Sequence, residues 1–112
     1  MQHKDKIILN KILSETDIVL NAVRGMDFQT FDSDEIFKRG ICMTAINIGE
    51  LVKNLSPEFR LKYNQVPWKS IAGFRDIAAH KYNTLNMHDV YVTVTTDFDY
   101  LKEIILKILS ED

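Results

Sequence analysis

The scarcity of helix-breaking residues is the feature that most constrains this fold. The chain has 112 residues but only four glycines and two prolines, and both prolines, Pro57 and Pro67, lie within one short stretch. Such long uninterrupted segments favour helices over a sandwich or barrel with many turns. Apolar residues make up 46% of the chain and the formal net charge is -2, which argues against disorder. A chain of this length supports one core, so we assign residues 1–112 to a single domain.

Apolar residues recur at intervals of three and four along most of the chain, which is the spacing of an amphipathic helix. A first helix is predicted over Lys6–Val23, ending near Gly25. The pair Asp32 and Glu35 resembles a capping box at the start of a second long helix. That helix is predicted to continue to Leu55.

The second half of the chain is divided by its prolines. Pro57 is predicted to open a short basic helix over residues 57–64, and Pro67 to restart the chain into a helix that runs toward His80. Residues 83–86 are expected to form a loop.

Residues 90–96 are ambiguous, because they are rich in branched side chains that alternate as in a strand. We predict a helix there, since the apolar residues of 101–109 continue with helical spacing and a solitary strand would have no partner. The expected fold class is therefore all-α, an antiparallel bundle of four to five helices.

Signals for export or membrane insertion are not seen. The first residues lack the continuous apolar core of a secretion signal, and the apolar stretch 41–48 is far too short to cross a bilayer. The single cysteine, Cys42, cannot form an internal disulfide, and its apolar surroundings predict a buried packing residue. We expect a cytoplasmic protein without membrane contact.

Positive charge is concentrated in one part of the chain. Residues 53–82 carry six basic and two acidic side chains, a local charge of +4, which leaves -6 on the remainder. A local basic surface on an acidic protein can direct a polyanion to one site, although a solvated helix face is the simpler reading. The basic residues are Lys53, Arg60, Lys62, Lys69, Arg75 and Lys81.

A short motif lies within that window. Arg75 is followed by four residues, His80, one residue and Tyr82, after a helix that starts at a Pro-Trp pair. This pattern resembles the signature of HEPN domains, specifically the HepT-like toxin family. The Gly49-Glu50 pair, the stretch from the tryptophan to the motif and the long apolar C-terminal helix also look like that family, so the resemblance covers most of the chain.

The resemblance implies a fold, an activity and partners. Members are all-helical homodimers that cleave RNA without a metal, and a minimal nucleotidyltransferase (MNT) acts as antitoxin by attaching AMP to the motif tyrosine. Arg75 and His80 would then be the nuclease pair, and Tyr82 the AMPylated residue, in a type VII-like HEPN/MNT toxin-antitoxin system. Asp76 departs from the pattern, since many members have Asn directly after the arginine.

The residue types suit this chemistry without the family name. Histidine can transfer a proton near neutral pH, and a guanidinium can hold two phosphate oxygens while charge builds on phosphorus. Asp76 lies four residues before His80, so its carboxylate would share that helix face and favour or orient the imidazole. Glu50 could position the site by binding Arg75 or Lys81, and an exposed-face role is equally compatible with its pattern.

No metal and no cofactor are predicted. His3 and His88 have no carboxylate or cysteine at metal-ligand spacing. Aromatic residues near the motif, Trp68, Phe74 and Tyr91, are expected to pack in the core, with base stacking as the alternative.

The spacing of the nuclease pair imposes a constraint. Five residues along a regular helix turn about 140° and rise about 7.5 Å, so Arg75 and His80 do not share a face. Either the helix breaks near Ala79 or a second subunit completes the site, and we favour the composite site of a homodimer. The small residues Gly73, Ala78 and Ala79 would permit close approach of helices.

Two function classes follow. The first is a metal-independent endoribonuclease toxin that cleaves by attack of the 2'-hydroxyl. The alternative is a non-catalytic helical module that binds nucleotide or phosphate and partners a nucleotidyltransferase. A purely structural bundle, with the motif in its core, is a third and weaker reading.

Overall fold

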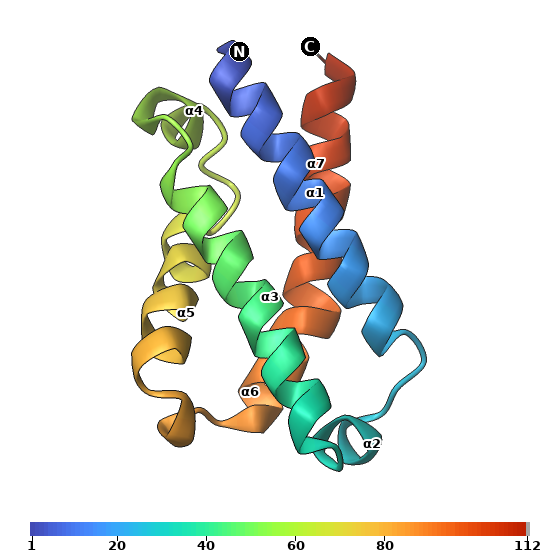
Figure 1. The fold of residues 1–112 in the computed structure, drawn as a ribbon. Coiled ribbons are helices and arrows are strands. Elements are labelled where there is room, and N and C mark those ends of the chain that lie inside the picture. The colour runs from blue at the N-terminus through green and yellow to red at the C-terminus, as the bar shows by residue number, and fades with distance from the viewer. Residues whose placement is uncertain (112) are drawn as a thin grey trace.

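The computed structural model describes residues 1–111 and is helical through nearly all of them; the last residue of the predicted domain, Asp112, lies outside the described residues. Four long helical segments run up and down in turn, and both termini lie at the same end of the bundle (Figure 1). They are α1 (His3–Val23), α3 (Glu35–Lys53), α5 (Trp68–His80) and a C-terminal segment made of α6 (Met87–Val92), the π-helical η2 (Thr93–Asp97) and α7 (Phe98–Glu111). Short elements connect them: α2 (Phe28–Asp32), α4 (Pro57–Lys62) and the 3₁₀ turn η1 (Tyr82–Thr84). The predicted all-α bundle is confirmed.

The first helix agrees with its prediction but begins three residues earlier, at His3. It ends before Gly25, whose φ of +71° lies in the left-handed region that glycine adopts without a Cβ penalty.

The predicted capping box is wrong. The N-cap of α3 is Asp34, which accepts a hydrogen bond from the Phe37 amide at 3.0 Å. Asp32 instead ends the short helix α2, which the sequence analysis did not predict and which Asp27 caps through the Thr30 amide at 2.8 Å. The apolar periodicity of residues 28–32 spans a single turn, too short to be distinguished from a loop.

The ends of α3 and α4 each fall two residues before their predicted ends. α3 ends at Lys53 instead of Leu55, and α4 ends at Lys62 instead of residue 64. Pro57 is the first residue of α4, as expected. The predicted loop at 83–86 overlaps the 3₁₀ turn η1, and Asn86 then caps α6 by accepting from two backbone amides.

Residues 90–96 are helical, as predicted against their strand propensity. Val90 and Val94 are buried at 1% and 0% exposure, and Phe98 and Leu101 continue the same buried face. The regular repeat of three and four residues across these positions places them in the core of the bundle, and packing there outweighs local preference. The π-helical turn η2 falls within this segment.

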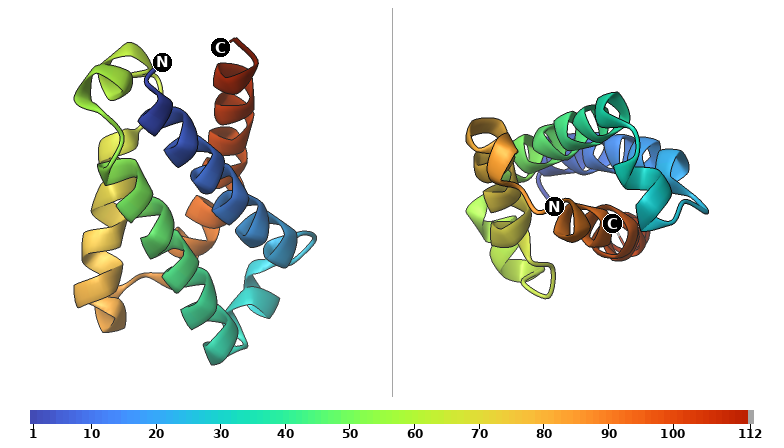
Figure 2. Two further views of the ribbon diagram at one scale, coloured as in Figure 1. Left: turned by 45° about the horizontal axis from the view of Figure 1, so that its top comes forward. Right: turned by 90° about the horizontal axis from the view of Figure 1, so that it is seen from below.

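The core lies between α1, α3 and the C-terminal segment, which enclose it when the bundle is seen from below (Figure 2). A buried polar contact closes one end, where the Asp5 carboxylate accepts from the Ser56 amide at 2.8 Å and from its hydroxyl at 2.7 Å. The largest fully buried side chains are Phe31, Phe98, Leu9, Ile12, Ile48, Leu55, Leu101 and Ile105.

Helix α5 is attached to the bundle mainly through α3, its most extensive helix contact. A Cβ at Gly49 of α3 would lie 2.6 Å from the Arg75 Cβ and 3.1 Å from the Ile71 carbonyl, so only glycine fits this crossing. By contrast, a Cβ at Gly73 would meet nothing within 4 Å, so Gly73 does not provide a close approach within this chain. Between α5 and the C-terminal segment lies a pocket of about 440 Å³.

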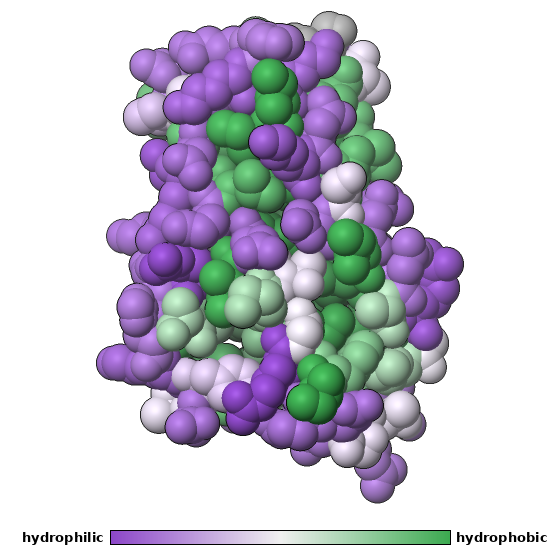
Figure 3. Space-filling view, viewed as in Figure 1, coloured by the Kyte–Doolittle hydropathy of each residue, from purple (hydrophilic) through white to green (hydrophobic). Residues whose placement is uncertain are grey.

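Hydrophobic side chains also reach the surface. On the face where α1 and α3 lie in front, they gather along the middle among hydrophilic residues (Figure 3). Within residues 1–111, no helix is long and apolar enough to cross a membrane.

Candidate functional site

Arg75 projects from the middle of α5 at its crossing with α3. Its Cβ packs over Gly49, and its guanidinium reaches past that glycine to two acids. Nε lies 3.4 Å from Glu50 Oε2, an ion-pair distance without an aligned hydrogen bond, and Nη1 donates to Asp76 Oδ1 at 3.1 Å. The side chain is 27% exposed. Of the alternatives left open for Glu50, the pairing with Arg75 is the one present, and the guanidinium remains within reach of solvent.

Asp76 binds two cations on this surface, and neither of them is His80. Its Oδ1 accepts from Lys53 Nζ at 2.7 Å and from Arg75. The hydrogen bond from Lys53, followed by that from Arg75, holds the pKa of the Asp76 carboxyl below its usual value. The expectation that Asp76 would orient the His80 imidazole is wrong, because its carboxylate binds Lys53 and Arg75 instead.

His80 is the last residue of α5, and its side chain is exposed. It forms no hydrogen bond or ion pair with another side chain of the described range. The helix does not break near Ala79: it stays regular through His80, and the Lys81 amide donates to the Ile77 carbonyl at 2.7 Å. The alternative in which His80 folds back toward Arg75 is therefore wrong.

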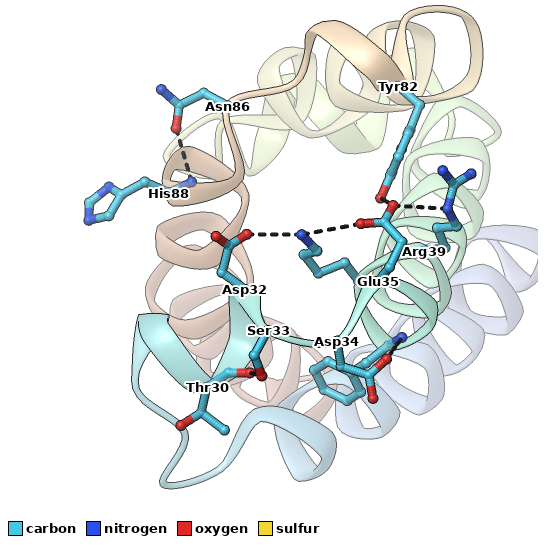
Figure 4. Close-up of polar contacts among 11 residues, drawn as sticks. Thr30, Asp32, Ser33, Asp34, Glu35, Arg39, Tyr82, Asn86 and His88 are labelled. Atoms are coloured by element: carbon cyan, nitrogen blue, oxygen red, sulfur yellow. Dashed lines mark hydrogen bonds and ion pairs between the residues drawn. The ribbon is translucent and has the colours of Figure 1, made fainter.

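Tyr82 lies two residues beyond His80, in the 3₁₀ turn η1, and its side chain crosses to the start of α3 (Figure 4). Its hydroxyl donates to Glu35 Oε1 at 3.2 Å, and the Arg39 guanidinium lies 4.7 Å from the ring centroid. The ring is half-buried against the core. Burial, and then the hydrogen bond to Glu35, raise the pKa of Tyr82 above its usual value.

A charged network surrounds that hydroxyl. Glu35 Oε1 also accepts from Arg39 Nε at 3.0 Å, while Lys38 Nζ lies 3.3 Å from Glu35 Oε2 and 3.0 Å from Asp32 Oδ1. The hydrogen bond from Lys38 is the largest effect that lowers the pKa of Glu35. Two cations therefore bind the carboxylate that accepts the hydrogen bond from the Tyr82 hydroxyl.

The sequence did not indicate this network, and it placed Lys53 only in the basic window, not as a partner of Asp76. The spacing of Glu35, Lys38 and Arg39 at i, i+3 and i+4 was a signal for helix-surface ion pairs. No local pattern indicated that Tyr82, 47 residues away, would share them.

Other residues of the predicted basic surface are spread along α4 and α5. Lys81 is exposed beside His80, whereas Arg60 and Lys62 lie at the opposite end, on α4.

Trp68 is a core residue as expected, 5% exposed, with its Nε1 donating to the Tyr63 carbonyl at 3.0 Å.

Cys42 is 2% exposed, as the sequence predicted, and burial raises the pKa of its thiol to about 11. Such a thiol has little thiolate character and does not act as a nucleophile at neutral pH.

In the described part of the chain, no group of three or more His, Cys, Asp or Glu side chains is placed to hold a metal ion.

Comparison with known proteins gives consistent matches. Residues 12–108 match the model of the family described as Ribonuclease HepT-like. The chain is similar to "Putative RNase TTE0752" of Caldanaerobacter subterraneus, with 36% identity over 93% of each chain. It is also similar to "Putative RNase MJ0127" of Methanocaldococcus jannaschii (34% identity, 100% of this chain and 97% of the other). A third relative is "Probable ribonuclease HepT" of Thermococcus cleftensis (26% identity, 91% and 93%). No solved structure matches this chain.

Proposed function

This chain belongs to the HepT-like ribonuclease family, and from that premise we propose that it is an endoribonuclease that cleaves RNA without a metal ion through Arg75 and His80. The observation that carries the proposal is the state of His80, an exposed imidazole without a side-chain partner in the described range. It lies on the same helix as a guanidinium that is 27% exposed. A proton carrier and a phosphate-binding cation are the two groups that metal-free phosphodiester transfer needs.

The proposed reaction is a transesterification. The 2'-oxygen of one nucleotide bonds to the neighbouring phosphorus, and the bond from that phosphorus to the 5'-oxygen of the next nucleotide breaks. The products are a 2',3'-cyclic phosphate and a 5'-hydroxyl, so one proton leaves the 2'-oxygen and one is gained by the 5'-oxygen. His80 carries out one of these proton transfers, and Arg75 holds the charged phosphate oxygens.

Arg75 can exchange its acidic partners for a phosphate. Its contacts with Glu50 and Asp76 are surface ion pairs, a class that contributes little net free energy because solvent and salt screen it. Glu50 and Asp76 then act as supporting residues that hold the guanidinium in place until RNA arrives, and exposed Lys81 adds positive charge beside His80.

We place the complete site between two copies of the chain. A regular α5 turns Arg75 and His80 about 140° apart, so one helix does not direct both at one phosphate. Both helices that carry the site also expose apolar side chains, with Met43 58% exposed on α3 and Ile77 51% exposed on α5. Such residues suit a homodimer interface. Met43→Glu together with Ile77→Glu should convert a dimer to monomers in light scattering and abolish cleavage.

The partner is a nucleotidyltransferase of the minimal type acting as antitoxin in a type VII-like system. It would AMPylate the hydroxyl of Tyr82, a residue that lies at the protein surface two positions beyond His80. Co-expression with such an enzyme should add the mass of AMP to wild-type protein and not to Tyr82→Phe, and the modified protein should not cleave RNA.

Purified protein tests the nuclease proposal directly. Wild type should cleave single-stranded RNA in the presence of EDTA, and His80→Ala and Arg75→Ala should each reduce the rate by about 100-fold or more. His3→Ala is the matched control, because His3 is also exposed at a helix end but lies at the far end of the chain. Equal background cleavage by wild type and His80→Ala would contradict the proposal and favour the non-catalytic nucleotide-binding module.

A further inference from the structure

His80 and Tyr82 are separated by one residue, and backbone hydrogen bonds make that junction stiff. The Lys81 amide donates to Ile77 at the end of α5, while the Lys81 carbonyl accepts from the Thr84 amide at 2.9 Å and from the Thr84 hydroxyl at 2.8 Å. A displacement of Tyr82 is therefore transmitted to His80.

Few apolar contacts hold this end of α5. In its last turn Ile77 is 51% exposed, Ala79 is exposed, and Ala78, the one buried residue of the three, has only a methyl group to pack. The half-buried ring of Tyr82 packs against the core, and its hydroxyl makes a contact with α3 that these residues do not make.

We propose that Glu35 is a positioning residue for His80, acting through the Tyr82 hydroxyl. Glu35 Oε1 accepts hydrogen bonds from the tyrosine hydroxyl and from Arg39, and Lys38 pairs with the other oxygen, Oε2, so the carboxylate at the start of α3 has three partners. The tyrosine ring beneath Arg39 is held from its face as well as from its hydroxyl. The Glu35–Tyr82 hydrogen bond thereby fixes where the imidazole at the end of α5 stands.

This inference rests on the proposed nuclease role of His80, and it adds a physical route from Tyr82 modification to inactivation. In AMPylation the Tyr82 oxygen bonds to the α-phosphorus of a nucleoside triphosphate, pyrophosphate leaves, and the phenolic proton is lost. The modified oxygen no longer donates to Glu35, and an anionic phosphodiester now stands against that carboxylate. Modification would thus release the end of α5 as well as obstruct the site.

Variants of the two partners test the positioning role without any antitoxin. Glu35→Ala and Tyr82→Phe should each lower kcat for RNA cleavage on the order of tenfold with little change in KM, because the imidazole is displaced while phosphate binding persists. Glu35→Gln should recover most of the rate, since its amide oxygen still accepts from the tyrosine. The double variant Glu35→Ala/Tyr82→Phe should be no slower than either single variant, because both remove one bond.

Controls separate this inference from general effects. Glu58→Ala removes the equivalent first-turn acid of α4 and should leave cleavage unchanged. Circular dichroism of each variant confirms folding, and Tyr82→Phe remains informative if Glu35→Ala does not fold. Rates of Glu35→Ala and Tyr82→Phe close to wild type, or additive losses in the double variant, would overturn the positioning role. An inactive wild type, or an active His80→Ala, would instead contradict the proposed function.

Discussion

Helix α5 is held to α3 in two different ways at two different places. In its middle, Gly49 lets the Arg75 Cβ and the Ile71 carbonyl approach within distances that no other residue allows. At its end, Tyr82 reaches α3 through a hydrogen bond to Glu35 and through the contact of its ring with Arg39, in a network open to solvent. The first contact is steric and the second is polar.

The steric contact stabilises the packing of α5 on the bundle, whereas the polar contact can be altered and so can change the position of His80. A backbone crossing responds to neither pH nor chemical modification, so it keeps α5 on the bundle under all conditions. By contrast, an enzyme can modify the tyrosine hydroxyl, and acid can protonate its carboxylate partner and so weaken the hydrogen bond between them. Placing the proposed catalytic histidine beside the polar contact makes its position adjustable without unfolding the helix.

Gly49→Val breaks the steric contact and should have the largest effect. The new side chain would overlap the Arg75 Cβ and the Ile71 carbonyl, forcing α5 away from α3 and costing about 3 kcal/mol. Urea unfolding followed by circular dichroism measures the loss, and RNA cleavage should disappear with it. A Gly49→Val variant as stable as wild type would mean that the crossing tolerates a wider separation.

Gly73→Ala tests the opposite case on the same helix. A Cβ there meets nothing within 4 Å, and alanine is the better helix former, so stability should rise by about 0.5–1 kcal/mol. The same urea titration reports it. If dimerisation packs another chain against Gly73, the variant would instead shift the monomer–dimer equilibrium in light scattering.

The long helices could be predicted from sequence because each follows its own apolar spacing. Residues 90–96 show the strength of that signal, since Val90 and Val94 continue the buried face of Leu101 despite strand propensity. Helix starts were less predictable: the capping box at Asp32 fitted the local rule, but Asp34 caps α3 because the unpredicted turn of α2 occupies the residues before it.

The site could be predicted only in part for a related reason. Arg75, His80 and Tyr82 form a contiguous motif, and the pairing of Glu50 with Arg75 was one of the alternatives that the sequence left open. The partners that decide their geometry come from elsewhere in the chain. Lys53 binds the Asp76 carboxylate, and Glu35 accepts a hydrogen bond from Tyr82, 47 residues away. Both contacts form only because α5 packs on α3.

Acid should weaken the hydrogen bond between Tyr82 and Glu35 and leave the crossing at Gly49 unchanged. This is the smallest effect that we expect. Hydrogen bonding from Lys38 lowers the pKa of Glu35 below its ordinary 4.5, so its stabilisation is fully present above that value and is lost as pH falls through the folded-state pKa. Between pH 7 and pH 3 the advantage of wild type over Glu35→Gln in Tm, at most a few degrees, should shrink. The penalty of Gly49→Val carries no titrating group of its own and should stay constant over the same range. A Glu35→Gln difference that was as large at pH 3 as at pH 7 would show that the carboxylate charge does not contribute to holding Tyr82, and that this contact depends on hydrogen-bond geometry alone.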